Sequence, residues 1–70
     1  MDAKNIKIEV GRRLRDLREK AGWSQEELGF RSGLHRNYIG DIERGERNVA
    51  VVNIAKLAKA LAVRPRDLLP

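Results

Sequence analysis

The chain has 70 residues, a formal net charge of +5 and no cysteine. A chain of this length buries only about 60% of its unfolded surface, so we expect one small domain over residues 1–70, held together by helix packing without disulfides or thiolate-bound metal. No apolar signal-peptide segment opens the sequence, and asparagine and lysine interrupt its longest apolar stretch, residues 49–63, which argues for a cytoplasmic protein without a membrane span.

The first segment is predicted to be an amphipathic helix that Gly22 ends. Its apolar residues recur at steps of four and three, the spacing that puts side chains on one stripe of a helix. Arginines and acidic residues on the other faces are typical of a solvated surface with local ion pairs. The predicted stripe consists of Ile6, Val10, Leu14, Leu17 and Ala21.

A second, short helix is predicted to begin after Ser24. Ser24 can cap the first turn, and Glu27 can return a hydrogen bond to the Ser24 amide, which together make a capping box. Trp23, just before the cap, can pack on Leu28 as a hydrophobic staple. Gly33 suits the left-handed conformation that ends a helix and turns the chain, so a third helix follows at once.

The third helix, which Gly45 ends, is predicted to have an apolar and a polar face. Tyr38, Ile39 and Ile42 lie on the apolar side. A guanidinium and an amide near the start of the polar side have the shapes best suited to guanine and adenine edges in a major groove, although a merely solvated face remains an alternative. A glycine inside this helix is tolerable if something must approach its backbone closely. The polar face consists of Arg36, Asn37, Gly40, Asp41 and Arg44.

Two further helices complete the predicted fold. A polar loop with Arg47 and Asn48 leads to a fourth helix, and Pro65 suits the first position of a fifth helix of one or two turns. The sequence therefore predicts an all-α, compact bundle of four to five short helices. The core stripe of the fourth helix is predicted to be Val52, Ala55, Leu57, Ala58, Leu61 and Ala62.

The run from residue 14 to residue 61 resembles the Xre/Cro helix-turn-helix family, whose fold is that of the lambda and 434 phage repressors. The motifs on which this resemblance rests are the "SQEEL" helix start, Gly29, the turn glycine Gly33 and "YIGDIERG". More narrowly, "GLHRNYIGDIERGERN" with "NIAKLAKAL" is similar to the controller proteins of restriction–modification systems. The sequence departs from the common pattern at Gly29, usually alanine, and at His35 and Ala50, usually serine or threonine, which bears on local stability more than on function.

The resemblance implies a lambda-repressor-like DNA-binding domain that places its third helix in the major groove of an operator. Asp41 either accepts a hydrogen bond from a cytosine amino group or orients Arg36 or Arg44. The implied base contacts are Arg36, Asn37, Gly40 and Asp41. The implied phosphate contacts are Gln25, His35, Tyr38, Arg44, Arg47, Asn48 and Asn53.

Two further roles follow from the same resemblance. Arg18 and Glu43 are expected to form a partly buried structural ion pair beneath the motif, and His35 to cap the third helix or contact a phosphate. A regulator of this type binds double-stranded DNA as a homodimer, with RNA polymerase as a candidate partner. The apolar candidates for the dimer interface are Leu61, Val63, Leu68 and Leu69.

Other classes of function are less compatible with the sequence. No nucleophile is placed beside a base, and no histidine–carboxylate cluster or phosphate-binding glycine loop is present, so we expect neither an enzyme nor a cofactor or metal. The alternative is an antitoxin-type or other protein-interaction module with the same fold. RNA is a poorer ligand than DNA, because an A-form major groove does not admit a helix.

Overall fold

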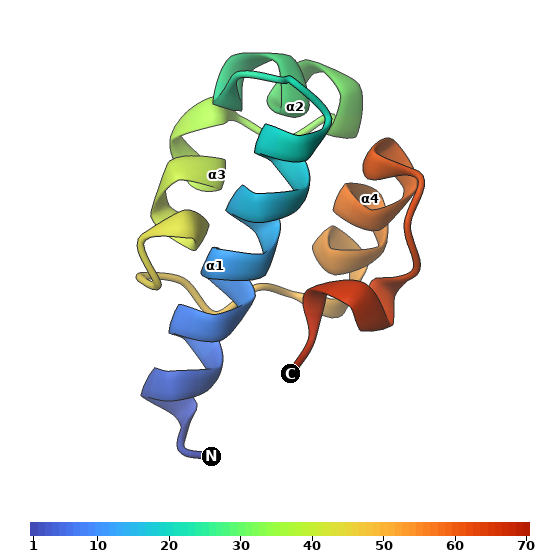
Figure 1. Cartoon of the computed structure of the whole chain (residues 1–70). Coiled ribbons are helices and arrows are strands. Elements are labelled where there is room, and N and C mark those ends of the chain that lie inside the picture. The colour runs from blue at the N-terminus through green and yellow to red at the C-terminus, as the bar shows by residue number, and fades with distance from the viewer.

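The computed structural model describes residues 1–70 as helices joined by short connections, with no strand (Figure 1). This confirms the all-α prediction. Its elements are α1 (Ala3–Lys20), α2 (Gln25–Ser32), α3 (Arg36–Glu43), α4 (Val51–Leu61) and the 3-10 helix η1 (Pro65–Leu68). The predicted fifth helix is thus a single 3-10 turn, with Pro65 at its start.

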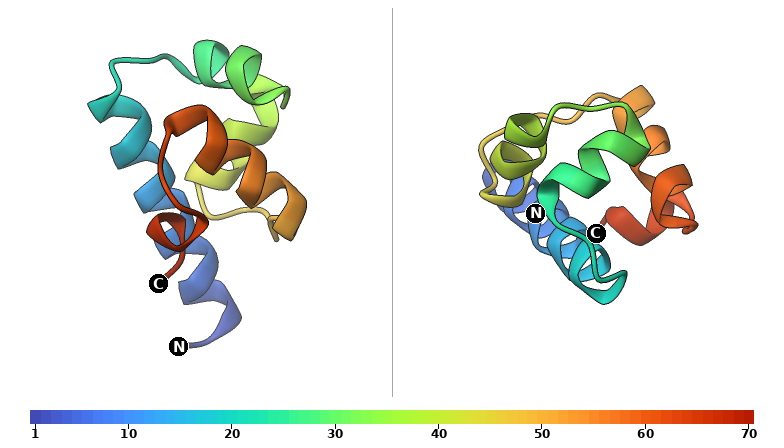
Figure 2. Two further views of the ribbon diagram at one scale, coloured as in Figure 1. Left: turned by 90° about the vertical axis from the view of Figure 1, so that its right-hand side faces the viewer. Right: turned by 90° about the horizontal axis from the view of Figure 1, so that it is seen from above.

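α1 is the longest helix and forms the axis of the bundle (Figure 1). α3 packs on one side of it and η1 on another, while α2 packs against both α3 and α4. The two chain termini lie at the end of the molecule away from α2, as Figure 1 and the left view of Figure 2 show. The α2–α3 pair is therefore presented on the outside of the bundle.

Every element contributes to a single apolar core. Seven of its residues are almost completely buried, and no polar or charged residue is buried as a whole. Because each helix contributes only one to three core residues, no helix can keep its position without the others. The core consists of Val10, Leu14, Leu28, Ile39, Ile42, Ile54, Leu57, Ala58 and Leu68.

The predicted core stripes were partly wrong. In α1, Val10 and Leu14 are buried, but Ile6 is exposed at the free end of the helix and Ala21 lies beyond its last turn. In α4, Ile54 belongs to the core although it was not predicted there. The error in α1 arises because periodicity does not show where a helix ends or where it extends past its neighbours. The error in α4 arises because periodicity gives a face but not its phase relative to neighbouring helices. The predicted α4 residues that are exposed instead are Val52, Ala55 and Ala62.

The ends of the helices follow the predicted signals with two differences. Ser24 Oγ accepts from the Glu27 amide at 3.0 Å, but the Glu27 carboxylate pairs with Arg31 one turn later, so the return arm of the capping box is absent. Gly33 takes the expected left-handed conformation, with φ of 77°. The second difference is at the end of α4, which stops one residue early because Ala62 is also left-handed, with φ of 58°.

Candidate nucleic-acid interface

The turn between α2 and α3 fixes these helices against each other. The Gly29 carbonyl accepts from the amides of Gly33 and Leu34 at 2.9 and 3.1 Å. A Cβ at Gly29 would lie 2.6 Å from the Leu34 carbonyl oxygen, so glycine suits this tight turn although alanine is usual in the family. His35 lies just before α3, and its Nδ1 accepts from the Asn37 amide at 3.0 Å, which is the expected N-cap.

The start of α3 presents two polar side chains to solvent. Arg36 and Asn37 are both exposed, as their proposed role in reading bases requires. Arg36 Nη1 donates to the Glu26 carboxylate of α2 at 2.7 Å. This pairing, across ten residues of sequence, has no signal in local spacing and was not predicted. Both side chains are largely exposed, so the contact can be exchanged for another partner at small cost.

Gly40 differs from its predicted role. It is buried rather than displayed, because the Gln25 and Arg44 side chains cover it. A Cβ at this position would lie 3.3 Å from Gln25 Oε1 and 3.2 Å from Arg44 Nη1. The close approach that glycine allows here is therefore made by the protein's own side chains.

Asp41 orients two arginines on the same face. Its Oδ1 accepts from Arg44 Nη2 at 2.5 Å, and its Oδ2 accepts from Arg47 Nε at 3.2 Å. Arg36, which was one predicted partner, is held by Glu26 instead. Of the two expected roles of Asp41, orientation is therefore realised in this structure, with Arg44 and Arg47 as the oriented groups.

A second cluster joins α3, the following loop and α4. The Asn53 side-chain amide donates to the Tyr38 hydroxyl at 3.0 Å. The Arg47 guanidinium lies over the Tyr38 ring, 5.2 Å from its centroid. Three of the predicted phosphate-contacting residues, distant in sequence, thus meet at one edge of α3. Asn48 follows Arg47 in the same loop, is exposed, and lines a groove between α1 and α4.

Beneath the motif, Arg18 and Glu43 form the expected ion pair. Arg18 donates to both carboxylate oxygens, at 2.7 and 3.0 Å, and the side chains are only 11% and 5% exposed. Gln25 donates to the same carboxylate at 3.1 Å, and Arg18 donates to the Trp23 carbonyl at 2.8 Å. The hydrogen bonds that Arg18 donates to Glu43 raise the pKa of Arg18 above its usual value. This network ties α1, α2 and α3 together.

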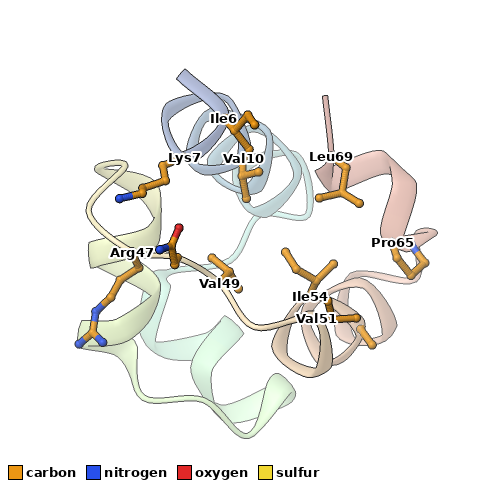
Figure 3. Close-up of a pocket in the computed structure, with 11 residues that line it drawn as sticks. Ile6, Lys7, Val10, Arg47, Val49, Val51, Ile54, Pro65 and Leu69 are labelled. Carbon is orange, nitrogen blue, oxygen red and sulfur yellow. The ribbon is translucent and has the colours of Figure 1, made fainter. Parts of the chain in front are cut away.

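The predicted dimer residues are only partly exposed. Leu68 is completely buried in the core and cannot form an interface, while Leu61 and Val63 are half-buried. Leu69 is exposed and lines a mostly apolar groove of about 260 Å³ between α1, the start of α4 and η1 (Figure 3). Val51, on the same groove, is 84% exposed. The positive groups of Lys7 and Arg47 point away from the apolar part of the groove.

Residues 1–70 contain neither a candidate metal site nor a candidate membrane span. No group of three or more histidine, cysteine, aspartate or glutamate side chains could hold a metal ion. No helix is long and apolar enough to cross a membrane.

Comparison with known proteins identifies the family of this chain. A family model described as helix-turn-helix matches residues 14–68. The chain belongs to the helix-turn-helix family of DNA-binding regulators, in its Xre branch. This family consists of regulators and not of enzymes.

Several relatives of this helix-turn-helix protein are restriction–modification control proteins. Control protein C.BamHI of Bacillus amyloliquefaciens is 53% identical over 66 residues, which cover 93% of this chain and 82% of the relative. The crystal structure of the restriction–modification controller C.AhdI from Aeromonas hydrophila superposes with a TM-score of 0.88 at 56% identity, covering 90% of this chain and 96% of that one. A hypothetical transcription factor from Neisseria superposes with a TM-score of 0.90 at 38% identity, over 100% of this chain and 80% of that one.

Proposed function

We propose that this protein controls the transcription of restriction–modification genes by binding an operator in double-stranded DNA as a homodimer. Residues 1–70 act as one DNA-binding domain in the cytoplasm, and α3 enters the major groove. The observation that carries this proposal is the exposed pair Arg36 and Asn37 at the start of α3. The similarity to C.BamHI and C.AhdI supports the choice of regulated genes.

The side chains divide into base-reading and phosphate-binding groups. Arg36 can donate two hydrogen bonds to guanine, and Asn37 can pair with adenine. Arg44, Arg47 and the neutral donors around them suit phosphates, which fix the register without reading sequence. The proposed phosphate contacts at the Tyr38 edge are Tyr38, Arg44, Arg47, Asn48 and Asn53, and those near the start of α2 and α3 are Gln25 and His35.

A comparison of Arg36→Ala with Arg47→Ala tests this division. The operator is first obtained by selection from random duplexes with the wild-type protein, and a scrambled duplex serves as reference. Arg36→Ala should cost about 1–3 kcal/mol per half-site on the operator, and the loss should shrink when the guanine is also changed. Arg47→Ala should weaken both duplexes equally and lower the slope of log affinity against log salt by about one per half-site.

The assignment is reversed if Arg36→Ala leaves the ratio of operator to scrambled affinity unchanged while Arg47→Ala removes it. Failure of the wild-type protein to select any sequence contradicts the proposed function itself. The restriction–modification assignment predicts methyltransferase and endonuclease genes beside the gene for this protein, and selection of DNA fragments from that region tests it. Addition of RNA polymerase to the same binding assay tests the contact with polymerase.

The homodimer is proposed to form through the exposed apolar residues at the start of α4 and the end of the chain. Val51, Val52 and Leu69 are the exposed members, at 84%, 64% and 43%. A single helix-turn-helix reads only a few base pairs, so a second copy about one helical turn away is needed for useful specificity. Val51→Lys should shift sedimentation to the monomer, whereas Phe30→Lys, at an equally exposed position on α2, should not. An unchanged dimer in Val51→Lys excludes this face.

A further inference from the structure

Asp41 occupies a special position among the charged groups of α3. The other acidic residue of this helix, Glu43, is buried against Arg18 and takes no part in the exposed face. Asp41 is 27% exposed at its side chain and contacts two arginines that are each more than half exposed. Asp41 therefore pairs with both Arg44 and Arg47, and Arg44 also donates to the exposed Glu46 carboxylate at 3.1 Å. Asp41 is the one carboxylate that contacts both arginines, so a phosphate that binds either arginine must share it with Asp41 or displace Asp41.

The contacts of Asp41 also fix the loop that carries these arginines. Its carbonyl oxygen accepts from the Glu46 amide at 2.9 Å, immediately before Arg47. Its carboxylate directs the Arg47 guanidinium to a place over the Tyr38 ring. The Tyr38 hydroxyl in turn accepts from Asn53 of α4. Asp41 thus positions the arginines relative to both α3 and α4.

We propose that Asp41 is a positioning residue that sets how strongly the protein prefers its operator over other DNA. This inference rests on the proposed function. Binding to unrelated DNA is almost entirely electrostatic, so a carboxylate that partly neutralises two arginines weakens it. Operator binding gains from arginines that are already ordered before the encounter, because less side-chain freedom is lost on association. The same carboxylate therefore lowers the affinity for unrelated DNA more than the affinity for the operator.

The test compares Asp41→Asn with Asp16→Asn. Each variant removes one negative charge, but Asp16 is on α1, outside the helix-turn-helix, where it pairs with Arg12 at 2.9 Å and is 60% exposed. Affinities are measured for the duplex selected by the wild-type protein and for a scrambled duplex, at several salt concentrations. Thermal melts and two-dimensional NMR spectra verify that both variants fold, and Asp41→Ser provides a second substitution without the charge.

Asp41→Asn and Asp41→Ser should tighten binding to the scrambled duplex about threefold to tenfold per half-site, and should steepen its salt dependence by about one unit. Affinity for the operator should rise less or fall, so that the preference for the operator drops at least threefold. Asp16→Asn should change both affinities by the same factor. In an Arg47→Ala background, the effect of Asp41→Asn on this preference should be markedly smaller, because one of the two positioned arginines is absent.

Three results would overturn the proposal. The first is an operator preference in Asp41→Asn equal to that in Asp16→Asn. The second is an undiminished effect in the Arg47→Ala background. The third is a loss of discrimination confined to one base pair, which would make Asp41 a base-reading group. Loss of selectivity by the wild-type protein would instead contradict the proposed function and is recognised separately, before any variant is compared.

Discussion

Replacement of Arg18 by methionine should destabilise the protein more than any other single charge removal on α1. The Glu43 carboxylate is 5% exposed and accepts two hydrogen bonds from Arg18 and one from Gln25. Arg18→Met leaves only the Gln25 contact, while the methionine side chain still fills part of the space. Breaking one partner of a buried pair costs about 3–5 kcal/mol. A domain of this size has only roughly 4–10 kcal/mol of stability, so the variant should be close to unfolding at 25 °C.

A double-mutant cycle separates the pair from its surroundings. Glu43→Met leaves the Arg18 guanidinium with the Trp23 carbonyl at 2.8 Å and with limited access to water, so its cost should also reach about 3 kcal/mol. Glu43 raises the pKa of Arg18, and an arginine without an acidic partner also stays protonated at neutral pH. Arg18 is therefore charged both in the wild-type protein and in Glu43→Met. The double variant removes both charges, and its loss should be smaller than the sum of the single losses by at least about 2 kcal/mol.

Urea unfolding followed by circular dichroism and by the fluorescence of Trp23, the single tryptophan, measures these losses. Arg15→Met is the matched control, because Arg15 lies on the same helix and pairs with Glu19 at 3.2 Å while 63% exposed. It should change the free energy of unfolding by less than about 1 kcal/mol. Single losses of that same size for Arg18→Met and Glu43→Met, adding without coupling, would refute the argument and make the pair equivalent to a surface contact.

Three further predictions concern individual details of the fold. Hydrogen bonds from Arg12, and to a smaller extent from Arg13, lower the pKa of Glu9 from 4.5 to about 2. The contribution of Glu9 to stability should therefore be complete above pH 4.5 and be lost as the pH falls towards 2. An NMR titration of the Glu9 carboxyl should show a midpoint near pH 2, and Arg12→Ala should raise that midpoint. His35→Ala should lower the free energy of unfolding by about 1 kcal/mol, and His35→Ser should restore most of it. Ala62→Gly should raise it by about 0.5–1 kcal/mol in the same urea assay, since glycine adopts the left-handed conformation without strain.

Signals that act within a few residues predicted the structure best. The Ser24 cap and the Gly33 turn were readable because a cap or a left-handed glycine acts on its own helix end. The phase of α4 was not readable, since Val52 and Ile54 are both apolar and only packing against other helices decides which is buried. The Arg18–Glu43 pair, 25 residues apart, came from the family resemblance and not from spacing.

The pairing of Asp41 with Arg44 was one of the expected arrangements, but the Glu26–Arg36 and Asp41–Arg47 pairs were not predicted, because local spacing does not show them. Glu26 and Arg36 meet only because the α2–α3 turn brings two helices together. In the free protein, Arg36 and Arg47 therefore already have acidic partners. When DNA binds, each arginine exchanges a carboxylate for a base or a phosphate. An exposed ion pair contributes at most about 1 kcal/mol, so exchange of the Glu26 contact offsets only part of the roughly 1–3 kcal/mol that Arg36 gains from guanine. The Asp41 contacts are less exposed and shared by two arginines, so their exchange has the larger effect on affinity. The loss of DNA affinity measured for Arg47→Ala in the wild-type background is therefore reduced by the cost of breaking the Arg47–Asp41 contact. The same substitution in an Asp41→Asn background measures the phosphate contact without that cost.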